Sequence, residues 1–439
     1  LRAKRQQVID ALSHIGKLPH VLVRETLAAQ SPWNYRNKMQ FPIGLAKGNI
    51  VVGCFAQGSH TIIDTENCHI QREPNNALAN AVRAIAAQLR IPVYNEDTHK
   101  GILRHIVGRV GQNGDLMAVI VTATKQLPRA KEFVRLLREH LPNLVSVHQN
   151  IQTYRNNVIM GRDTVLLWGK PTILDGLGRL HFHISPRSFF QVNTQQAERL
   201  YEQALSYADL HGTETVIDAY CGTGTITLFL AQRARKVYGI EIVQPAILDA
   251  RKNARDNHVK NAEFIVGDAT KVMPALYKQG IRPDVVVVDP PRAGCTPTVL
   301  QTFADMKPQR IIYISCNPAT LARDLAILKE HGYHAQEVQP VDLFPQTSHV
   351  ETVALLSKLD VDKHIDVEIK LDELDLTSAE SKATYAQIKK YILEKFDLKV
   401  STLYIAQIKK KCGIALREHY NKSKKEKQVI PQCTPEKEE

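Results

Sequence analysis

The second half of the chain alternates between short apolar segments and amphipathic segments, and this alternation limits the folds open to it. Apolar runs of strand length occur at 215–218, 236–240, 262–266, 285–289 and 311–315, each followed by a segment with helical spacing. Strands that alternate with helices form a parallel sheet with helices on both faces. We therefore predict an open α/β sheet here, which binds its ligands at the carboxyl ends of the strands.

The rest of the chain differs from this pattern and suggests further domains. Residues 1–20 have the spacing of a basic helix, and residues 21–184 mix short strands with two helices. We predict an α+β central domain at 21–184 and the α/β sheet domain at 185–357. Residues 358–439 turn from acidic to lysine-rich, and we predict a small helical basic extension there.

Composition favours a nucleic-acid partner and a reducing compartment. The formal net charge of +12 attracts polyanions, although charge alone leaves a merely basic protein equally open. The apolar runs are too short to cross a membrane. The seven cysteines are an odd number without a Cys-x-x-Cys pair, and the basic N-terminus has no apolar run behind it. This pattern indicates free thiols in a cytoplasmic protein.

Acidic residues end three consecutive strands of the predicted sheet. Asp218 leads into a turn with Gly222 and Gly224, and the next two strands end at Glu241 and near Asp268. The spacing fits neither a dinucleotide fingerprint nor a Walker loop, and a glycine turn alone is a weak signal. An acid about 20 residues after the loop suits a ribose diol. S-adenosylmethionine fits this set, because it has a ribose, an adenine and a charged amino-acid tail but no phosphate.

Two further strand ends carry residues suited to chemistry. Asp289 is followed by two prolines, which hold the backbone rigidly, and then by Arg292, a candidate for a phosphate or a structural ion pair. Cys316 follows the next strand. A thiolate there can add to C6 of a pyrimidine and make C5 a carbon nucleophile. The alternative is a small buried cysteine without chemistry.

The proposed addition needs a base that removes the C5 proton before the thiol leaves. Glu351 on a late strand is the candidate, and His349 is the alternative. Upstream of the sheet, Phe189 offers a ring that can stack on an extruded base, while Gln191 and Asn193 offer amides for a base edge or the cofactor. Core packing at a domain junction is the competing interpretation of this segment.

In combination these motifs resemble the S-adenosylmethionine-dependent RNA uracil-C5 methyltransferases. The resemblance covers roughly residues 1–357. It rests on five stretches: Phe189-x-Gln191-Val192-Asn193, Asp218-x-Tyr220-Cys221-Gly222-x-Gly224, Asp289-Pro290-Pro291-Arg292, Ser315-Cys316-Asn317-Pro318 and His349-Val350-Glu351.

The resemblance implies a role for each matching residue. Cys316 is then the nucleophile and Glu351 the base. The residues expected to contact the cofactor or to lie beside it are Gln191, Tyr220, Gly222, Gly224, Glu241, Asp268 and Asp289, with Asp268 at the adenine. The resemblance also implies that the segment 34–38 lies near the RNA.

Within the family the chain is most similar to the bacterial 23S ribosomal RNA enzymes. Those often hold a [4Fe–4S] cluster with three closely spaced cysteines and a fourth, distant one, which Cys68 matches. Four thiolates cannot be assembled here, so we expect either that the three precede Leu1 in a longer chain or that the cluster has been lost.

We therefore expect a monomeric, cytoplasmic enzyme that methylates C5 of a uridine in RNA, and 23S ribosomal RNA is the expected substrate. Two alternatives stay open. One is an RNA cytosine-C5 methyltransferase, which shares the thiol addition. The other is a non-catalytic RNA-binding or folding factor on the same scaffold.

Overall fold

The computed structural model describes residues 1–358, 389–390 and 393. The chain divides into two compact units, Leu1–Lys358 and Leu359–Glu439, and the first contains all the helices and strands named below. The helical, lysine-rich extension predicted at 358–439 lies almost entirely outside the described residues. Within the described part of the chain, no helix has both the length and the apolar character of a membrane span.

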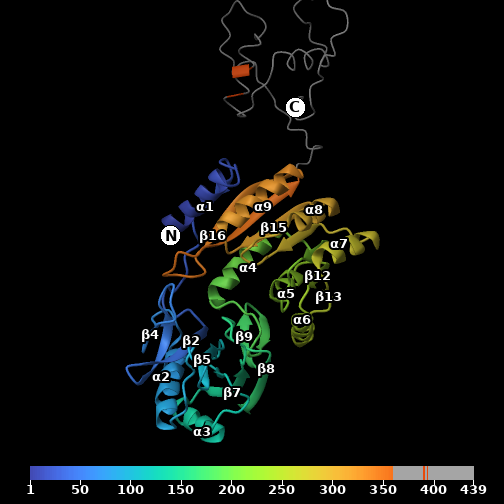
Figure 1. Ribbon diagram of the computed structural model, residues 1–439. Coiled ribbons are helices and arrows are strands. Elements are labelled where there is room, and N and C mark those ends of the chain that lie inside the picture. Colours follow the sequence, from blue (N-terminus) through green and yellow to red (C-terminus); the bar gives the residue numbers. More distant parts are fainter. Residues whose placement is uncertain (359–388, 391–392, 394–439) are drawn as a thin grey trace, which may run out of the picture. The chain divides into compact units, whose positions relative to one another are not determined.

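An eight-stranded sheet forms the larger layer of this unit, in the order β1-β16-β17-β15-β14-β11-β12-β13 (Figure 1). Neighbouring strands from β13 to β15 are parallel, and β17 runs antiparallel to both β15 and β16. The predicted α/β sheet is therefore confirmed, including its two closing strands. Its strands are β1 (Leu22–Val23), β11 (Thr215–Asp218), β12 (Lys236–Glu241), β13 (Ala262–Val266), β14 (Val285–Val288), β15 (Arg310–Ser315), β16 (Tyr333–Val341) and β17 (Glu351–Lys358).

Helices cover both faces of this sheet, as apolar parallel strands require. All four residues of β14 are buried, and alternate ones enter opposite layers. One layer holds α4 (Thr194–Ala208), α5 (Thr225–Ala231) and α6 (Gln244–Asp256). The other holds α1 (Arg2–His14), α7 (Ala269–Lys278), α8 (Pro297–Met306) and α9 (Pro318–Glu330).

The N-terminal segment belongs to this sheet through long-range packing. Val8 and Leu12 of α1 are buried in the same cluster as Leu321 and Leu325 of α9, and the two helices lie side by side (Figure 1). Strand β1 pairs in parallel with β16 at the edge of the large sheet. The assignment of these first strand residues to the central domain was therefore wrong. A two-residue strand carries too little periodicity to identify its partner.

A seven-stranded sheet forms the central region, in the order β4-β3-β2-β5-β6-β7-β8. Its strands are β2 (Lys38–Ala46), β3 (Asn49–Phe55), β4 (Ile62–Asp64), β5 (Leu103–Val110), β6 (Leu116–Thr122), β7 (Leu144–Ile151) and β8 (Asp163–Gly169). Met39 and Phe41 share a core with α2 (Glu73–Gln88) and α3 (Ala130–His140). On the opposite face, Val107 and Val119 join the core that includes α4 and the hairpin of β9 (Ile173–Leu177) and β10 (Leu180–Ile184).

We predict that truncating Leu12 destabilises the whole sheet unit. Leu12 is 1% exposed, so Leu12→Ala removes buried methyl groups and should lower the free energy of unfolding by about 2–5 kcal/mol. Denaturant titration followed by circular dichroism measures this. Ile15→Ala, at a position 50% exposed just past α1, is the control and should change stability little. Equal stability of the two variants would show that α1 does not contribute to the folded sheet.

Candidate active site

The strand register brings Cys316 and Glu351 together. Ser315, the last residue of β15, pairs with Thr352 of the antiparallel β17. The next residue of one strand is Cys316, and the preceding residue of the other is Glu351, so the two lie opposite each other. In the parallel strand β14, Val288 pairs with Tyr313, which places Asp289 beside the end of β15. Three residues predicted to carry chemistry thus meet at the carboxyl edge of the sheet.

The start of α9 positions the cysteine. The Asn317 side chain caps this helix by accepting a hydrogen bond from the backbone N–H of Ala319 at 3.1 Å. The same side chain donates through Nδ2 to the carbonyl of Arg292 at 3.2 Å, which joins the cysteine turn to the Asp-Pro-Pro-Arg turn. Thr352 donates from its hydroxyl to the Ser315 carbonyl at 3.0 Å. These bonds fix the backbone on both sides of Cys316.

The Cys316 thiol is half-buried and sits among charges that oppose its ionisation. Burial raises the pKa of Cys316, and the negative charges of Glu351 and Asp289 raise it further, while the Arg292 guanidinium lowers it. The free protein therefore holds a neutral thiol near pH 7. Arg292 is the positive charge in this set, and its exposed side chain can offset the negative charge when the thiolate forms.

Both acids of the site hold protons more tightly than ordinary carboxyl groups. Burial raises the pKa of Asp289 to about 6. Glu351 is buried, and burial followed by the Asp289 charge raises its pKa well above the usual value, against the lowering effect of Arg292. A carboxylate with a raised pKa is a stronger proton acceptor once it is ionised. His349, the alternative base, is exposed and packs edge-on against the Phe344 ring.

The glycine turn and the two acids that flank it form one connected group. The backbone N–H of Gly222 donates to Glu241 Oε2 at 3.2 Å, and no atom lies within 4 Å of where a Gly222 Cβ would stand. At Gly224, with φ of 84°, a Cβ would meet the Phe264 ring at 3.0 Å, which excludes larger residues. Asp218 is fully buried and accepts from the Thr227 hydroxyl at 2.6 Å.

These features fit S-adenosylmethionine. Asp218 Oδ1 is buried and has no hydrogen-bond partner among the described residues, and burial raises the pKa of this carboxyl to about 7. A buried acceptor without a partner is costly unless a ligand donor reaches it. Glu241 lies at the sheet edge, where its two carboxylate oxygens accept from the backbone N–H groups of Gly222 and Val243, and each oxygen keeps a second lone pair that a ribose hydroxyl can reach. Gly222 lies between these two acids in the sequence, and the space beside its Cα is open.

Asp268 is exposed and serves as a helix cap. Its Oδ1 accepts from the backbone N–H of Thr270 at 2.8 Å and from the hydroxyl of that residue at 2.7 Å, and these bonds lower the pKa of the carboxyl. It follows β13, the strand beside β12, so it lies on the glycine-turn side of the sheet. Its contact with adenine stays a prediction.

Gln191 is held by two elements. Its carbonyl accepts from Asn37 Nδ2 at 3.0 Å, which ties it to the start of β2. The side chains of Gln191 and Thr225 lie beside the hydroxyl of Tyr201. Burial raises the pKa of Tyr201. Asp289 and Glu351 also act on this phenol, so Tyr201 is a member of the site. The sequence did not identify Tyr201, because its position matches the spacing of the core residues in α4. The available signal was a residue with a hydroxyl group among the apolar residues of that helix face.

A second group that was not predicted supports the turn after Asp289. Asp324 of α9 is fully buried, and its Oδ2 accepts from the backbone N–H of Cys295 at 2.7 Å and from the Tyr313 hydroxyl at 2.5 Å. The Cys295 thiol in turn faces the hydroxyl of Tyr220, the residue predicted to lie beside the cofactor. The chain of contacts from α9 to the glycine turn is therefore continuous.

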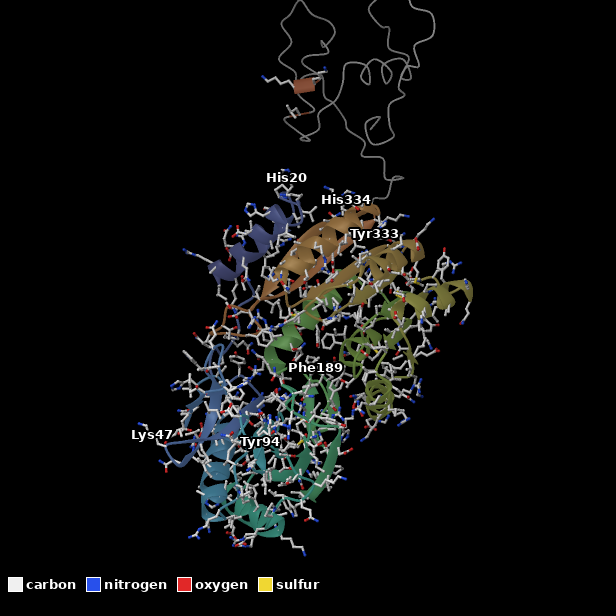
Figure 2. All side chains as sticks on the ribbon, viewed as in Figure 1. His20, Lys47, Tyr94, Phe189, Tyr333 and His334 are labelled. Carbon is white, nitrogen blue, oxygen red and sulfur yellow. The ribbon has the colours of Figure 1, made fainter. Side chains whose placement is uncertain are left out.

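The residues predicted to bind the substrate differ in how the structure places them. Phe189, labelled in Figure 2, lies on the segment that leads into α4. Its side chain is 69% exposed, so its ring is available to a base. Asn193 is buried; it caps α4 by accepting from Gln196 N and donates to the Leu343 carbonyl at 3.0 Å. We therefore assign Asn193 to the support of this segment and not to substrate binding.

Cys68 does not lie in a ligand set for a cluster. It is partly buried against the core of the central sheet, and Asn76 brackets its backbone with hydrogen bonds. Within residues 1–358, 389–390 and 393, no group of three or more His, Cys, Asp or Glu side chains is arranged to hold a metal. The residues that the structure describes do not by themselves form the ligand set of an iron–sulfur cluster.

We predict that removing the Glu351 charge lowers the pKa of Cys316. In Glu351→Gln, the pH midpoint of Cys316 alkylation by iodoacetamide, followed by peptide mass spectrometry, should shift downward. Glu263→Gln, at the exposed partner of Lys236 on β13, is the control and should leave the midpoint unchanged. An unchanged midpoint in Glu351→Gln would mean that the two groups are not electrostatic neighbours.

Comparisons with known proteins agree with this geometry. Residues 174–359 match the family model described as tRNA (Uracil-5-)-methyltransferase. An uncharacterised RNA methyltransferase of Halalkalibacterium halodurans is 51% identical over 357 residues, which is 81% of this chain and 78% of that protein. Another from Clostridium tetani is 49% identical over 358 residues, with the same shares.

A solved structure is similar over most of the chain. It is the Pyrococcus abyssi tRNA (uracil-54, C5)-methyltransferase in complex with S-adenosyl-L-homocysteine, at 28% identity and a TM-score of 0.66, covering 80% of this chain and 82% of that one. Homocysteine is what remains of the methyl donor's amino-acid tail after transfer. The relatives that match about four fifths of the chain agree with the family model. The chain therefore belongs to the family of S-adenosylmethionine-dependent RNA (uracil-5-)-methyltransferases.

Proposed function

We propose that this protein methylates C5 of a specific uridine in 23S ribosomal RNA through a temporary bond between Cys316 and C6 of the base. The observation that carries the proposal is the register of β15 and β17, which sets a thiol and a buried carboxyl group opposite each other at the ligand-binding edge. A nucleophile and a base on the two sides of one pyrimidine are what this chemistry requires.

The proposed reaction begins with the thiolate. The partly exposed Cys316 thiol gives its proton to water, and its sulfur bonds to C6 of the uracil, which places the electron pair of the C5–C6 double bond on C5 and O4. Arg292 offsets the developing negative charge beside the thiol. Bound S-adenosylmethionine would supply the methyl group to C5, and its sulfur would keep the electron pair of the broken S–CH3 bond and leave as S-adenosylhomocysteine.

Glu351 completes the proposed reaction as the base. Its carboxylate takes the proton from C5, the C5–C6 double bond re-forms, and the sulfur leaves C6. The raised pKa of Glu351 suits this step, because proton abstraction from carbon needs a strong acceptor. Burial also excludes water, which would compete for the same proton.

The residues proposed to hold the cofactor follow the same edge of the sheet. Asp218 and Gly222 shape the turn, Glu241 accepts from the ribose, and Asp268 lies toward the adenine. Gln191, Tyr220, Gly224 and Asp289 surround the methyl-bearing end.

The identity of the RNA is the most specific part of the proposal. Ribosomal RNA is supported by the resemblance to the bacterial 23S enzymes, whereas the matched family model and the Pyrococcus abyssi enzyme name tRNA. tRNA is therefore the second candidate substrate. We further propose a monomer that works in the cytoplasm.

We predict that the protein forms 5-methyluridine in 23S ribosomal RNA transcripts and not in tRNA transcripts. Nucleoside mass spectrometry after incubation with labelled S-adenosylmethionine measures the product. Cys316→Ala should abolish turnover, because it removes the sulfur that adds to C6, and should bind the cofactor with nearly unchanged affinity. Isothermal titration calorimetry checks this second point.

Four results would contradict parts of this proposal. Label in 5-methylcytidine would refute the uracil assignment, and label in tRNA alone would refute the ribosomal one. Turnover that survives in Cys316→Ala would refute the covalent route. A protein that binds RNA but never methylates it would be a non-catalytic factor.

A further inference from the structure

The turn that carries Arg292 is held by the first two turns of α9. The Thr320 hydroxyl donates to the Arg292 carbonyl at 3.3 Å. One helical turn later, the Arg323 guanidinium donates to the carbonyl of Ala293 at 2.9 Å and to that of Cys295 at 3.2 Å. Residues three apart in an α-helix are neighbours on its surface, so both donors face the turn.

Asp324 completes this arrangement from inside the protein. It is fully buried, and its Oδ2 accepts from the backbone N–H of Cys295, while its Oδ1 accepts from Arg323 Nε at 2.8 Å. Gly294 lies between the two residues whose carbonyls Arg323 holds. Its φ is 75°, and a Cβ there would meet Asp324 Oδ2 at 2.6 Å, so the turn lies directly against the pair. We refer to Thr320, Arg323 and Asp324 as the turn clamp.

The Arg292 guanidinium has no fixed partner of its own among the described residues. Its side chain is exposed and makes no hydrogen bond or ion pair with any residue that the structure describes. Burial shifts the pKa values of Cys316, Glu351 and His349 most, and the Arg292 charge acts on all three in the lowering direction. The position of this charge therefore depends on the backbone from which the side chain projects, and the turn clamp fixes that backbone.

The turn clamp places a carboxylate where burial is unfavourable. Asp324 is taken fully out of water, and a buried ion pair often stabilises a fold no more than apolar side chains of similar volume would. The penalty is offset by donors from three elements: the turn itself, Arg323 of α9, and Tyr313 of β15. The turn carries Arg292, and Cys316 lies between β15 and α9. The pair therefore contributes the relative position of the turn and the helix more than stability.

We propose that the turn clamp positions Arg292 beside Cys316, so that the guanidinium offsets the thiolate charge when the sulfur attacks C6. This inference rests on the proposed function, since the thiolate is the nucleophile proposed there. Glu351 and Asp289 face the same sulfur with negative charge, and Arg292 supplies the positive charge that opposes them. The clamp residues touch neither the base nor the methyl donor; they are positioning residues that act through Arg292.

The test is a double-mutant cycle on the pH midpoint of Cys316 alkylation by iodoacetamide, measured by peptide mass spectrometry in the full chain. Arg292→Met removes the charge and should raise the midpoint. Thr320→Val removes one bond to the turn without changing any charge, and Arg323→Met removes two bonds; each should raise the midpoint by less. In the Arg292→Met background neither change should shift the midpoint further. Lys329→Met, at the exposed far end of α9, should leave it unchanged.

Thermal unfolding checks that the clamp variants fold. Both should fold, since Thr320→Val keeps the shape of the side chain and the Arg323 side chain is 46% exposed. An unchanged midpoint in both clamp variants overturns the inference. A shift that persists in the Arg292→Met background also overturns it, because the clamp would then act on Cys316 by another route. These alkylation measurements use no RNA, so their failure is distinct from a failure of the proposed methylation, which nucleoside analysis detects.

Discussion

The antiparallel pairing of β15 and β17 is the constraint on which the site depends. One hydrogen-bonded register sets the residue after Ser315 against the residue before Thr352. A shift by one residue would turn Glu351 to the opposite face of the sheet and leave the thiol without a facing acid. Strand β16 on the other side of β17, and α1 packed on α9, keep this edge of the sheet from fraying.

The charges at this edge oppose ionisation of the Cys316 thiol. Asp289, Glu351 and the Cys316 thiol all have raised pKa values because each is buried or faces the others. Arg292 is the opposing charge, and its backbone is bound to the same turn as the cysteine.

The parts of the fold that follow local periodicity were predictable from the sequence. The run Val285–Val288 indicates a buried parallel strand, and the residues that follow such strands identify the ligand edge. Partners separated by long stretches of chain were not predictable. The pairing of β1 with β16, the Tyr201 hydroxyl beside Gln191, and Asp324 beneath Cys295 depend on tertiary packing that no local pattern encodes. Asn193 shows the opposite case: its place in a motif suggested contact with substrate or cofactor, but its side chain caps α4.

The proposed mechanism depends most on a covalent bond whose release needs Glu351. The direct measurement is to incubate Glu351→Gln with substrate RNA and S-adenosylmethionine, resolve the mixture on a denaturing gel, and sequence the retarded species by mass spectrometry after nuclease and protease digestion. The mechanism predicts a methylated uridine joined to the peptide that contains Cys316. A retarded species joined to another residue, or none while methylation continues, would contradict it.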